Sequence, residues 1–423
     1  MRKCKFLIVS LLLLVIFTPQ ALCQKSFIDG KTITQRKEKG KNKTVTDNTE
    51  AVLSKGKGKS NINPNVRPKL YRNVYKKFGR WVGVGKEVPA SEMTNYVQLY
   101  RLSEQNMAGF WTKMEAIDFN GEFTTNHSMG TYVMNQLDDG DSVANEEWRD
   151  KLKTICQWSM IFDETGENVV QERAYDGTGN LVYTYTPMKV SNCESVGTYA
   201  NCWGIPVNLR GENGASLVKI KWDDKGNEIE YVFVDEKGRL MRNQNGVYIN
   251  KFSYDSCGNQ IENLSCNEFG TPVIDNCGNC GWKSKYDANY NQVWSCFIDE
   301  KMQLIKMPMT TRNANSDNIG VAITRYKHDQ KWGRMVEQSF YNEYDRPDTN
   351  AWGVHKYTLE YDMHGNIIWI KCHGTDGKIC GNGSWNGAGM LHKRYDKWGN
   401  VDMMEFFGKD TTERINVGED NDW

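Results

Sequence analysis

Short apolar segments alternate with turn residues along most of the chain after residue 158. Branched side chains recur two residues beyond a turn asparagine, and aromatic side chains often follow four positions later. Positions two and four apart lie on one face of a β-strand, and about eight residues between turns is a usual strand length. The branched positions are Val182, Ile229, Ile261, Val293, Ile368 and, in a shifted copy, Val336, and the aromatic positions are Phe233, Phe297, Phe340 and Phe406; Asp402 breaks the rule. The pattern predicts strands that each bury one face.

The turns themselves follow a register. An Asp-x-x-Gly phrase returns at spacings that alternate between twelve and twenty residues, and the last step is twenty-two. The turn glycines are Gly226, Gly238, Gly258, Gly270, Gly365, Gly377 and Gly399, with a looser earlier copy at Gly166 and Gly179. Continued through the chain, the register falls on Tyr290 and Met302, where glycine is absent, and resumes at Gly333 and Asp345 after an eleven-residue insertion. About seven repeats result, and a period in this range indicates an array of stacked units.

Each unit has the residue types of a β-hairpin. The aspartate caps its own turn, the glycine takes a positive φ, and the following asparagine tolerates the left-handed region. The residue before the aspartate is aromatic at Tyr175, Trp222, Tyr254, Tyr286, Tyr361 and Tyr395. Because a single hairpin cannot bury its apolar face alone, we expect the units to stack, with these rings in a column between neighbours.

The turn phrase resembles the YD-repeat, or RHS-repeat, class of exported bacterial proteins. The matching segments are YDGTGN, WDDKGN, YDSCGN, YDMHGN and YDKWGN, within residues 158–411. The longer spacing and the extra turn inside each unit depart from the family pattern. An open meander or solenoid therefore fits this sequence as well as the closed shell that some family members form. The predicted fold is mainly β: an elongated array of stacked β-hairpin repeats with a small α+β N-terminal cap.

The cap is assigned to residues 71–157. Strands are expected on either side of the Asn120-Gly121 turn, and the segment SVANEEWRDKLKTIC suits a short helix. Terminal units that cover an exposed sheet edge are what such an array needs. Residues 412–423 are assigned to a C-terminal tail.

The N-terminus has the layout of a secretory signal peptide over residues 1–23, with cleavage after Cys23; a lipid anchor at Cys23 is the less favoured alternative. Residues 24–70 carry twelve Lys and Arg against four Asp and Glu, whereas residues 71–423 carry thirty-eight against forty-nine. This segment is interpreted as a disordered basic spacer or, alternatively, as an arm for an anionic envelope surface. The expected location is exported: periplasmic, cell-surface or secreted. No transmembrane segment and no nucleic-acid partner are expected.

Ten cysteines lie between Cys156 and Cys380, and an even number in an exported protein favours disulfides. A local Cys193–Cys202 pair is one possibility, and others lie within the group that follows. The disulfide candidates are Cys193, Cys202, Cys257, Cys266, Cys277, Cys280 and Cys296. The Cys277-Gly-Asn-Cys280 motif is interpreted as structural, because redox CxxC motifs open a helix and zinc sites need further ligands at the right spacing.

Catalytic signals are weak throughout. The six histidines form no His-Glu-x-x-His pair, NGSWNG lacks the first glycine of a nucleophile elbow, and no phosphate-binding loop is present. The repeated aspartates could bind calcium, but turn capping is the preferred interpretation. No catalytic residue, metal site or cofactor is therefore predicted.

Aromatic residues provide the remaining candidates. Four tryptophans in glycine-rich, loop-like settings are predicted as sugar-stacking platforms: Trp203, Trp282, Trp352 and Trp385. The preferred function is an exported, non-enzymatic scaffold that binds a glycan or a protein at the cell envelope. The alternative is a secreted hydrolase of envelope or host polymers whose catalytic carboxylates cannot be identified. Toxin delivery or encapsulation follows from the family resemblance alone, and the oligomeric state stays open.

Overall fold

The computed structural model describes residues 62–125, 148–207 and 216–415, except positions 149, 244, 312, 314 and 315. Within these ranges no helix is long and apolar enough to cross a membrane. The predicted signal peptide, most of the predicted spacer and the last eight residues lie outside them. Residues 62–70 were assigned to the spacer, yet Ile62 bridges Asn106 and Lys69–Tyr71 pairs with a strand. The fold therefore begins earlier than the sequence predicts.

One antiparallel sheet of twenty strands forms most of the described structure. Its first half contains β1 (Lys69–Tyr71), β4 (Leu99–Gln105), β5 (Trp111–Ile117), β6 (Ile155–Phe162), β7 (Val169–Asp176), β8 (Leu181–Ser191), β9 (Glu194–Asn201), β10 (Leu217–Trp222), β11 (Glu228–Val234) and β12 (Leu240–Met241). Its second half contains β13 (Ile249–Tyr254), β14 (Gln260–Cys266), β15 (Gly281–Tyr286), β16 (Gln292–Ile298), β17 (Ile323–His328), β18 (Met335–Tyr341), β19 (Lys356–Tyr361), β20 (Ile367–His373), β21 (Met390–Tyr395) and β22 (Val401–Phe407).

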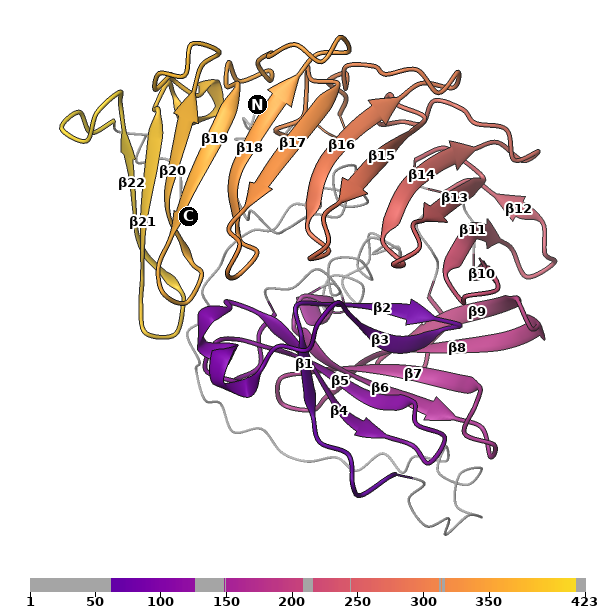
Figure 1. Ribbon diagram of the computed structural model, residues 1–423. Coiled ribbons are helices and arrows are strands. Elements are labelled where there is room, and N and C mark those ends of the chain that lie inside the picture. The colour runs from indigo at the N-terminus through magenta and orange to yellow at the C-terminus, as the bar shows by residue number, and fades with distance from the viewer. Residues whose placement is uncertain are drawn as a thin grey trace, which may run out of the picture.

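The strands pair almost entirely in chain order. β1 pairs with β4, and each later strand pairs with the next, while the two-residue β12 adds to the end of β11 beside β13. Because β6 belongs to this same sheet, the predicted boundary at residue 157 falls inside a strand. The mainly β array of stacked hairpins is confirmed, and the sheet is open and curved (Figure 1).

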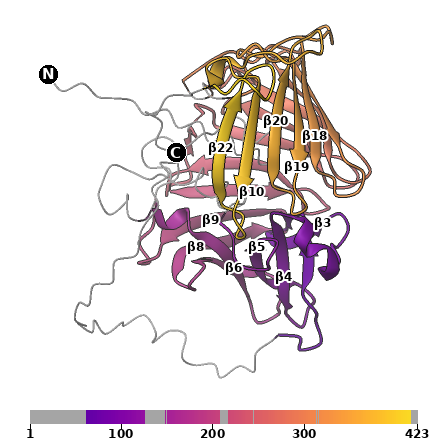
Figure 2. The same cartoon turned by 90° about the vertical axis from the view of Figure 1, so that its left-hand side faces the viewer.

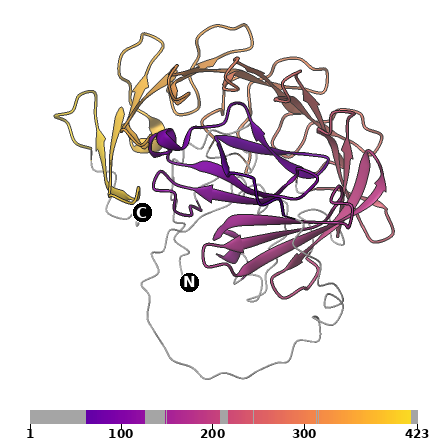
Figure 3. The same ribbon diagram turned by 60° about the horizontal axis from the view of Figure 1, so that its bottom comes forward.

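A small N-terminal cap completes the fold. It consists of the separate hairpin β2 (Asn73–Lys77) and β3 (Arg80–Val84), the 3-10 helix η2 (Ala90–Asn95) and a helical turn around Leu152. A second 3-10 helix, η3 (Gly383–Trp385), lies between β20 and β21. The hairpin lies within the curve of the sheet (Figure 3), where Trp81 packs with Tyr100 and Val218. The concave face is therefore the apolar one.

The repeated turn is held together by its own aspartate. In the Asp255 turn, one carboxylate oxygen accepts hydrogen bonds from the backbone N–H groups of Cys257 and Asn259, both at 2.9 Å. The other oxygen accepts the Asn259 side-chain amide at 2.8 Å. The same three bonds recur at Asp223, Asp287, Asp362 and Asp396. Each unit thus closes its hairpin locally, as the sequence predicts.

The predicted register also holds where glycine is missing. Tyr290, Met302 and Asp345 have φ values of 64°, 64° and 60°, so non-glycine residues adopt the left-handed conformation at the three extrapolated positions. This conformation strains a side chain with a Cβ atom, whereas glycine adopts it freely. The backbone turn therefore persists although its usual residue is gone.

The column of tyrosines joins neighbouring units through hydrogen bonds to the backbone. The hydroxyl of Tyr254 donates to the Glu228 carbonyl oxygen at 2.8 Å, and that of Tyr395 donates to the Ile367 carbonyl oxygen at 2.9 Å. Tyr361 bonds the Met335 carbonyl in the same way. Each tyrosine occupies a register shift just before the turn, which leaves the acceptor strand of the preceding unit within reach of its ring.

The array curves far enough for its last units to lie over its beginning (Figure 2). Arg334 donates hydrogen bonds to the carbonyl oxygens of Asn95 and Asp362, and the ring of His364 stacks on Phe119 with centroids 4.3 Å apart. Arg72 donates to the Asn291 side chain at 2.8 Å. Loop contacts rather than strand pairing therefore join the two ends of the described sheet.

Replacing Met302 with glycine should stabilise the protein. Glycine relieves the left-handed strain at this turn, and we expect a net gain of up to about 1 kcal/mol in the free energy of unfolding after the entropy cost of glycine in the unfolded chain. Met302→Ala keeps the Cβ atom and should give no gain. Urea unfolding checks both variants, and equal effects of glycine and alanine would contradict the strain argument.

The tyrosine column should make stability fall at high pH. Burial raises the pKa of Tyr395 to about 12, and burial likewise raises the pKa values of Tyr254, Tyr286 and Tyr361 above the ordinary 10.0. The stabilisation that these four tyrosines contribute is therefore fully present below pH 10, and it is lost as the pH rises through their folded-state pKa values. Tyrosinate absorbance and circular dichroism, followed together, should show these four residues ionising only as the fold is lost. Their ionisation near pH 10 in a folded chain would contradict the prediction.

Candidate functional site

Two of the four predicted tryptophan platforms are buried and are no longer candidates. Trp282 is 4% exposed and packs with Phe297 and Met307. Trp385 is 3% exposed, and its ring contacts the rings of Tyr357 and Phe406. A buried ring offers no face to a sugar. The curvature of the sheet explains why the prediction for these two residues is wrong, because large rings pack on the concave side even next to glycine-rich loops.

The other two tryptophans lie in two different turns along one rim of the sheet. Trp203 is 49% exposed in the turn after β9, and Trp352 is partly exposed in the turn before β19. The strand directions place both turns at the end of the sheet opposite the turns of Asp223, Asp255, Asp287, Asp362 and Asp396, whereas the Asp176 turn lies at the same end as Trp203. Sequence reasoning missed Phe269 and Tyr344, which lie at the same rim and are 84% and 74% exposed. We call Trp203, Phe269, Tyr344 and Trp352 the aromatic rim.

One turn chemistry positions all four rings. Each ring is two residues beyond an asparagine whose side-chain oxygen accepts the backbone N–H of the aromatic residue, at 3.0 Å for Trp203, Phe269 and Tyr344 and 3.1 Å for Trp352. Such Asx turns fix the local backbone without help from the core. The sequence signal was therefore available as asparagine followed by an aromatic residue two positions later.

The rim presents flat rings beside hydrogen-bonding groups. Glu268 precedes Phe269 and Glu343 precedes Tyr344, so an acidic residue is the chain neighbour of two of the rings. Lys251 reaches the Phe269 turn and donates to the Gly270 carbonyl oxygen at 2.9 Å. An apolar ring flanked by carboxylate and amide groups can stack on one face of a ligand and bond to its hydroxyl groups.

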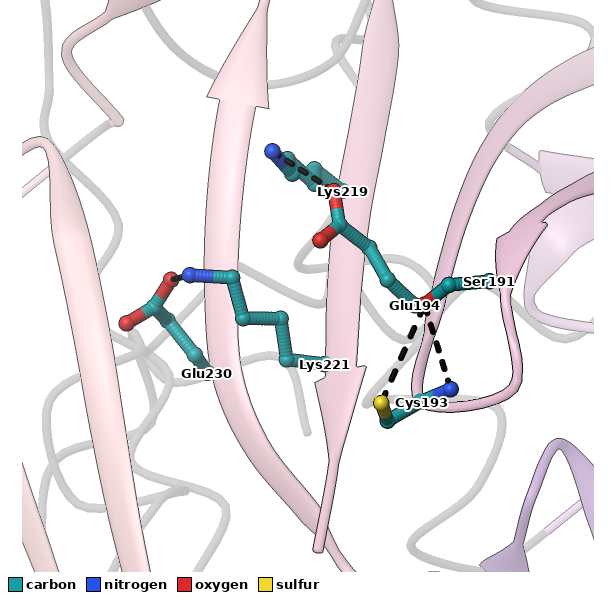
Figure 4. Close-up of polar contacts among 6 residues, drawn as sticks. All are labelled: Ser191, Cys193, Glu194, Lys219, Lys221 and Glu230. Carbon is teal, nitrogen blue, oxygen red and sulfur yellow. Dashed lines mark hydrogen bonds and ion pairs between the residues drawn. The ribbon is translucent and has the colours of Figure 1, made fainter.

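The face of the sheet opposite the apolar one carries opposite charges on adjacent strands. Lys219 pairs with Glu194 at 2.6 Å and Lys221 pairs with Glu230 at 2.5 Å (Figure 4). Further pairs follow along the array: Lys283–Glu262, Lys327–Glu337, Lys371–Glu360 and Arg394–Asp402. In the turn between β8 and β9, the Cys193 N–H donates to the Ser191 hydroxyl oxygen at 3.3 Å (Figure 4). Mutual neutralisation suits a solvated face rather than a polyanion site.

A buried polar cluster lies between β2 and strands β7 to β11. Lys76 contacts the Glu172 carboxylate at 2.7 Å, and the Tyr183 hydroxyl donates to Glu172 at 2.8 Å. Glu228 accepts from the Tyr231 hydroxyl, and burial raises the pKa of Glu228, with the Glu172 charge as a smaller cause. Glu228 and Glu172 are therefore neighbouring carboxylates in a buried setting.

Six of the seven disulfide candidates are thiols in the structure, and Cys277 is the exception. Cys193 and Cys202 lie at opposite ends of the eight-residue β9, about 25 Å apart, whereas a disulfide needs Cα atoms within about 7 Å. Cys257 and Cys266 are separated in the same way by β14. The predicted local Cys193–Cys202 pair is therefore wrong. The thiols are Cys193, Cys202, Cys257, Cys266, Cys280 and Cys296.

In the described part of the chain, no group of three or more His, Cys, Asp or Glu side chains is placed to hold a metal ion. The turn aspartates direct both carboxylate oxygens at their own turn, as the Asp255 turn illustrates. Turn capping therefore occupies the carboxylate oxygens that a bound calcium ion would need as ligands.

Comparison with known proteins gives limited information. No family model matches the chain, and no curated protein matches it. Matching crystal structures include TcdB2-TccC3 (11% identity, TM-score 0.23), TcdB2-TccC3 without its hypervariable C-terminal region (14%, 0.24) and TcdB2-TccC3-Cdc42 (12%, 0.23). Each match covers 79% of this chain and 16% or 17% of the other, so the chain spans about a sixth of their length. At these TM-scores the likeness supports no conclusion about function.

Removing the cation from the buried cluster should destabilise the fold. Lys76→Met leaves the Glu172 carboxylate buried without its cation, which we expect to cost about 3 kcal/mol in the free energy of unfolding. The double variant Lys76→Met, Glu172→Gln removes both charges and should recover much of that loss. Urea unfolding of both variants measures the difference, and an unaffected single variant would contradict a structural role for the ion pair.

Proposed function

We propose that this chain is an exported, non-enzymatic repeat scaffold that binds a glycan at the cell envelope through its aromatic rim. Export is supported by the signal-peptide layout of residues 1–23. The basic segment that follows would hold the scaffold near an anionic envelope surface by charge attraction. The resemblance of the turn phrase to YD-repeat proteins is consistent with an exported scaffold.

The observation that carries this proposal is the recurrence of exposed rings at one turn position. Phe269 and Tyr344 are among the most exposed large hydrophobic side chains described, and each costs free energy in water that folding does not recover. Because the asparagine caps hold their backbones in place, the rings lose little conformational freedom when a ligand binds. Exposed rings that recur with the structural repeat suit a polymeric ligand, because the chemical units of such a ligand also recur.

A glycan fits the rim better than a protein does. The rings stand on separate turns that follow different strands, and an acidic residue precedes Phe269 and Tyr344 in the chain. Protein interfaces concentrate their binding energy in a contiguous, desolvated centre, whereas sugar rings can be bound one at a time with hydroxyl groups bonded at the side.

A secreted hydrolase is the second candidate, and Glu172 with Glu228 is the observation in its favour. The raised pKa of Glu228 suits a general acid, and Glu172 is a neighbouring carboxylate. The cluster is also consistent with a purely structural role, because Lys76 and Tyr183 already satisfy Glu172. Release of soluble sugar products distinguishes the two functions.

Rim variants test the proposal directly. The purified chain is passed over immobilised envelope polysaccharides and other glycans, with retention and released reducing ends measured together. We expect saturable retention without products, and the triple variant Trp203→Ala, Phe269→Ala, Tyr344→Ala should weaken it at least about tenfold, since each stacked ring contributes roughly 1 kcal/mol. Trp398→Ala is the matched control, because Trp398 is 62% exposed in a capped turn at the opposite rim.

Four outcomes would count against the proposal. Retention that survives the triple variant would place the site elsewhere, and equal losses in the triple variant and the Trp398 control would indicate a non-specific effect. Released products that disappear in Glu228→Gln would favour the hydrolase. Binding to a protein ligand alone, with no glycan retained, would overturn the glycan assignment.

A further inference from the structure

Two cysteines that sequence spacing did not single out lie opposite each other in a hairpin beyond β20. His373 and Ile379 form an antiparallel bridge, and the next positions outward on the two strands are Cys372 and Cys380. The Cys380 N–H donates to the Cys372 carbonyl oxygen at 3.0 Å, and the Gly374 N–H donates to the Lys378 carbonyl oxygen at 2.9 Å. These bonds fix the hairpin register on both sides of the bridge.

That register brings the two side chains to one face of the hairpin. Residues directly opposite in an antiparallel pair have Cα atoms about 4.5–5.5 Å apart. A disulfide requires a Cα separation of about 4.4–6.8 Å. Among the nine thiols of the described chain, we find no other two at directly opposite positions. Cys266 and Cys280 come next, but Leu264 pairs with Gly281, so they are one position out of register and point to opposite faces.

We propose that Cys372 and Cys380 form an intramolecular disulfide when the chain meets a small disulfide oxidant such as oxidised glutathione. Both residues are thiols in the present structure, so this is the reduced form. The proposal does not rest on the glycan-binding function, because its observations are the hairpin register and the surroundings of the two thiols.

The surroundings assign an order to the reaction. Cys372 is fully buried, and its sulfur accepts a hydrogen bond from the Asn382 amide at 3.8 Å. Cys380 is only half-buried, and its thiol donates to the Gly353 carbonyl oxygen at 3.7 Å. The Cys380 thiolate therefore attacks one sulfur of oxidised glutathione first, which forms a mixed disulfide and expels one glutathione thiolate.

The second step closes the ring. The Cys372 thiolate attacks the Cys380 sulfur of the mixed disulfide and expels the second glutathione thiolate. The two cysteines lose two electrons, oxidised glutathione gains them, and the two thiol protons pass to the departing thiolates. Burial raises the pKa values of both cysteines, which lowers the thiolate fraction and makes the exchange faster at alkaline pH.

The bond would fasten the base of the loop that joins β20 to β21. Asn382, two residues beyond Cys380, donates to the Tyr357 hydroxyl at 3.1 Å, and the Gly383 N–H donates to the Trp352 carbonyl oxygen at 2.9 Å. The loop thus supports both the core beneath η3 and the turn that carries Trp352. A covalent link across the hairpin constrains the unfolded chain and should resist denaturant.

The test uses the full chain, purified under reducing conditions and then treated with oxidised glutathione at mildly alkaline pH. Remaining thiols are trapped with maleimide in denaturant after an acid quench, and peptides are analysed by mass spectrometry. We expect a linked peptide pair containing Cys372 and Cys380, lighter by two hydrogens than the separate thiols. A higher urea midpoint in the oxidised than in the reduced chain should accompany it.

Three variants sharpen the result. Cys372→Ser should leave Cys380 as a persistent glutathione mixed disulfide, and Cys380→Ser, which leaves the buried thiol in place, should abolish both the link and the midpoint shift. Cys296→Ser is the matched control, because Cys296 is buried opposite Lys283 and Ile323, and it should leave the link intact. Maleimide on both cysteines, a stable mixed disulfide at Cys380 in the unaltered chain, or pairing of either with another cysteine would each overturn the proposal.

Discussion

The carboxylate of the turn aspartate is the interaction on which the rest of the array depends. By accepting two backbone N–H groups and a side-chain amide, as in the Asp255 turn, it satisfies polar groups that would otherwise oppose a tight reversal of the chain. Each turn then sets the register of its two strands, because a slip of one residue would move the apolar face to solvent. The tyrosines before Asp255, Asp362 and Asp396 extend this local order to the preceding unit.

An open sheet of many strands must also protect its ends. Val88 bridges Leu70 of β1, and Arg414 bridges Phe407 of β22, so short segments cover part of both edges. Strands exposed at an edge invite pairing with other chains, and such covers reduce that hazard. The contacts of Arg334 and His364 with the N-terminal segment add a second constraint, since they hold the last units over the first ones.

The two rims of the sheet have different surroundings in consequence. The aspartate turns at one rim are drawn toward the N-terminal segment, where Phe78 donates its backbone N–H to the Gly226 carbonyl oxygen at 2.9 Å. The turns at the other rim carry the exposed rings Phe269 and Tyr344. A rigid sheet that presents variable turns at one edge is a usual basis for recognition. The paired charges of the opposite face keep that face solvated and leave the rim as the distinctive surface.

The sequence by itself determined the strands, their turns and their register, including the left-handed residues Tyr290 and Met302, because turn chemistry acts over four or five residues. Of the four tryptophans that it predicted as platforms, Trp203 and Trp352 are the two that are not buried, and the asparagine signal for Phe269 and Tyr344 was present but unused. Only the tertiary structure decided that Trp282 and Trp385 are buried, since their exposure depends on curvature accumulated over many strands. The same holds for the cysteines: Cys193 and Cys202 are close in sequence but separated by a strand, whereas a hairpin brings Cys372 opposite Cys380. Which side chains lie close together depends on strand pairing and on the curvature of the sheet, and neither can be read from the spacing of residues along the chain.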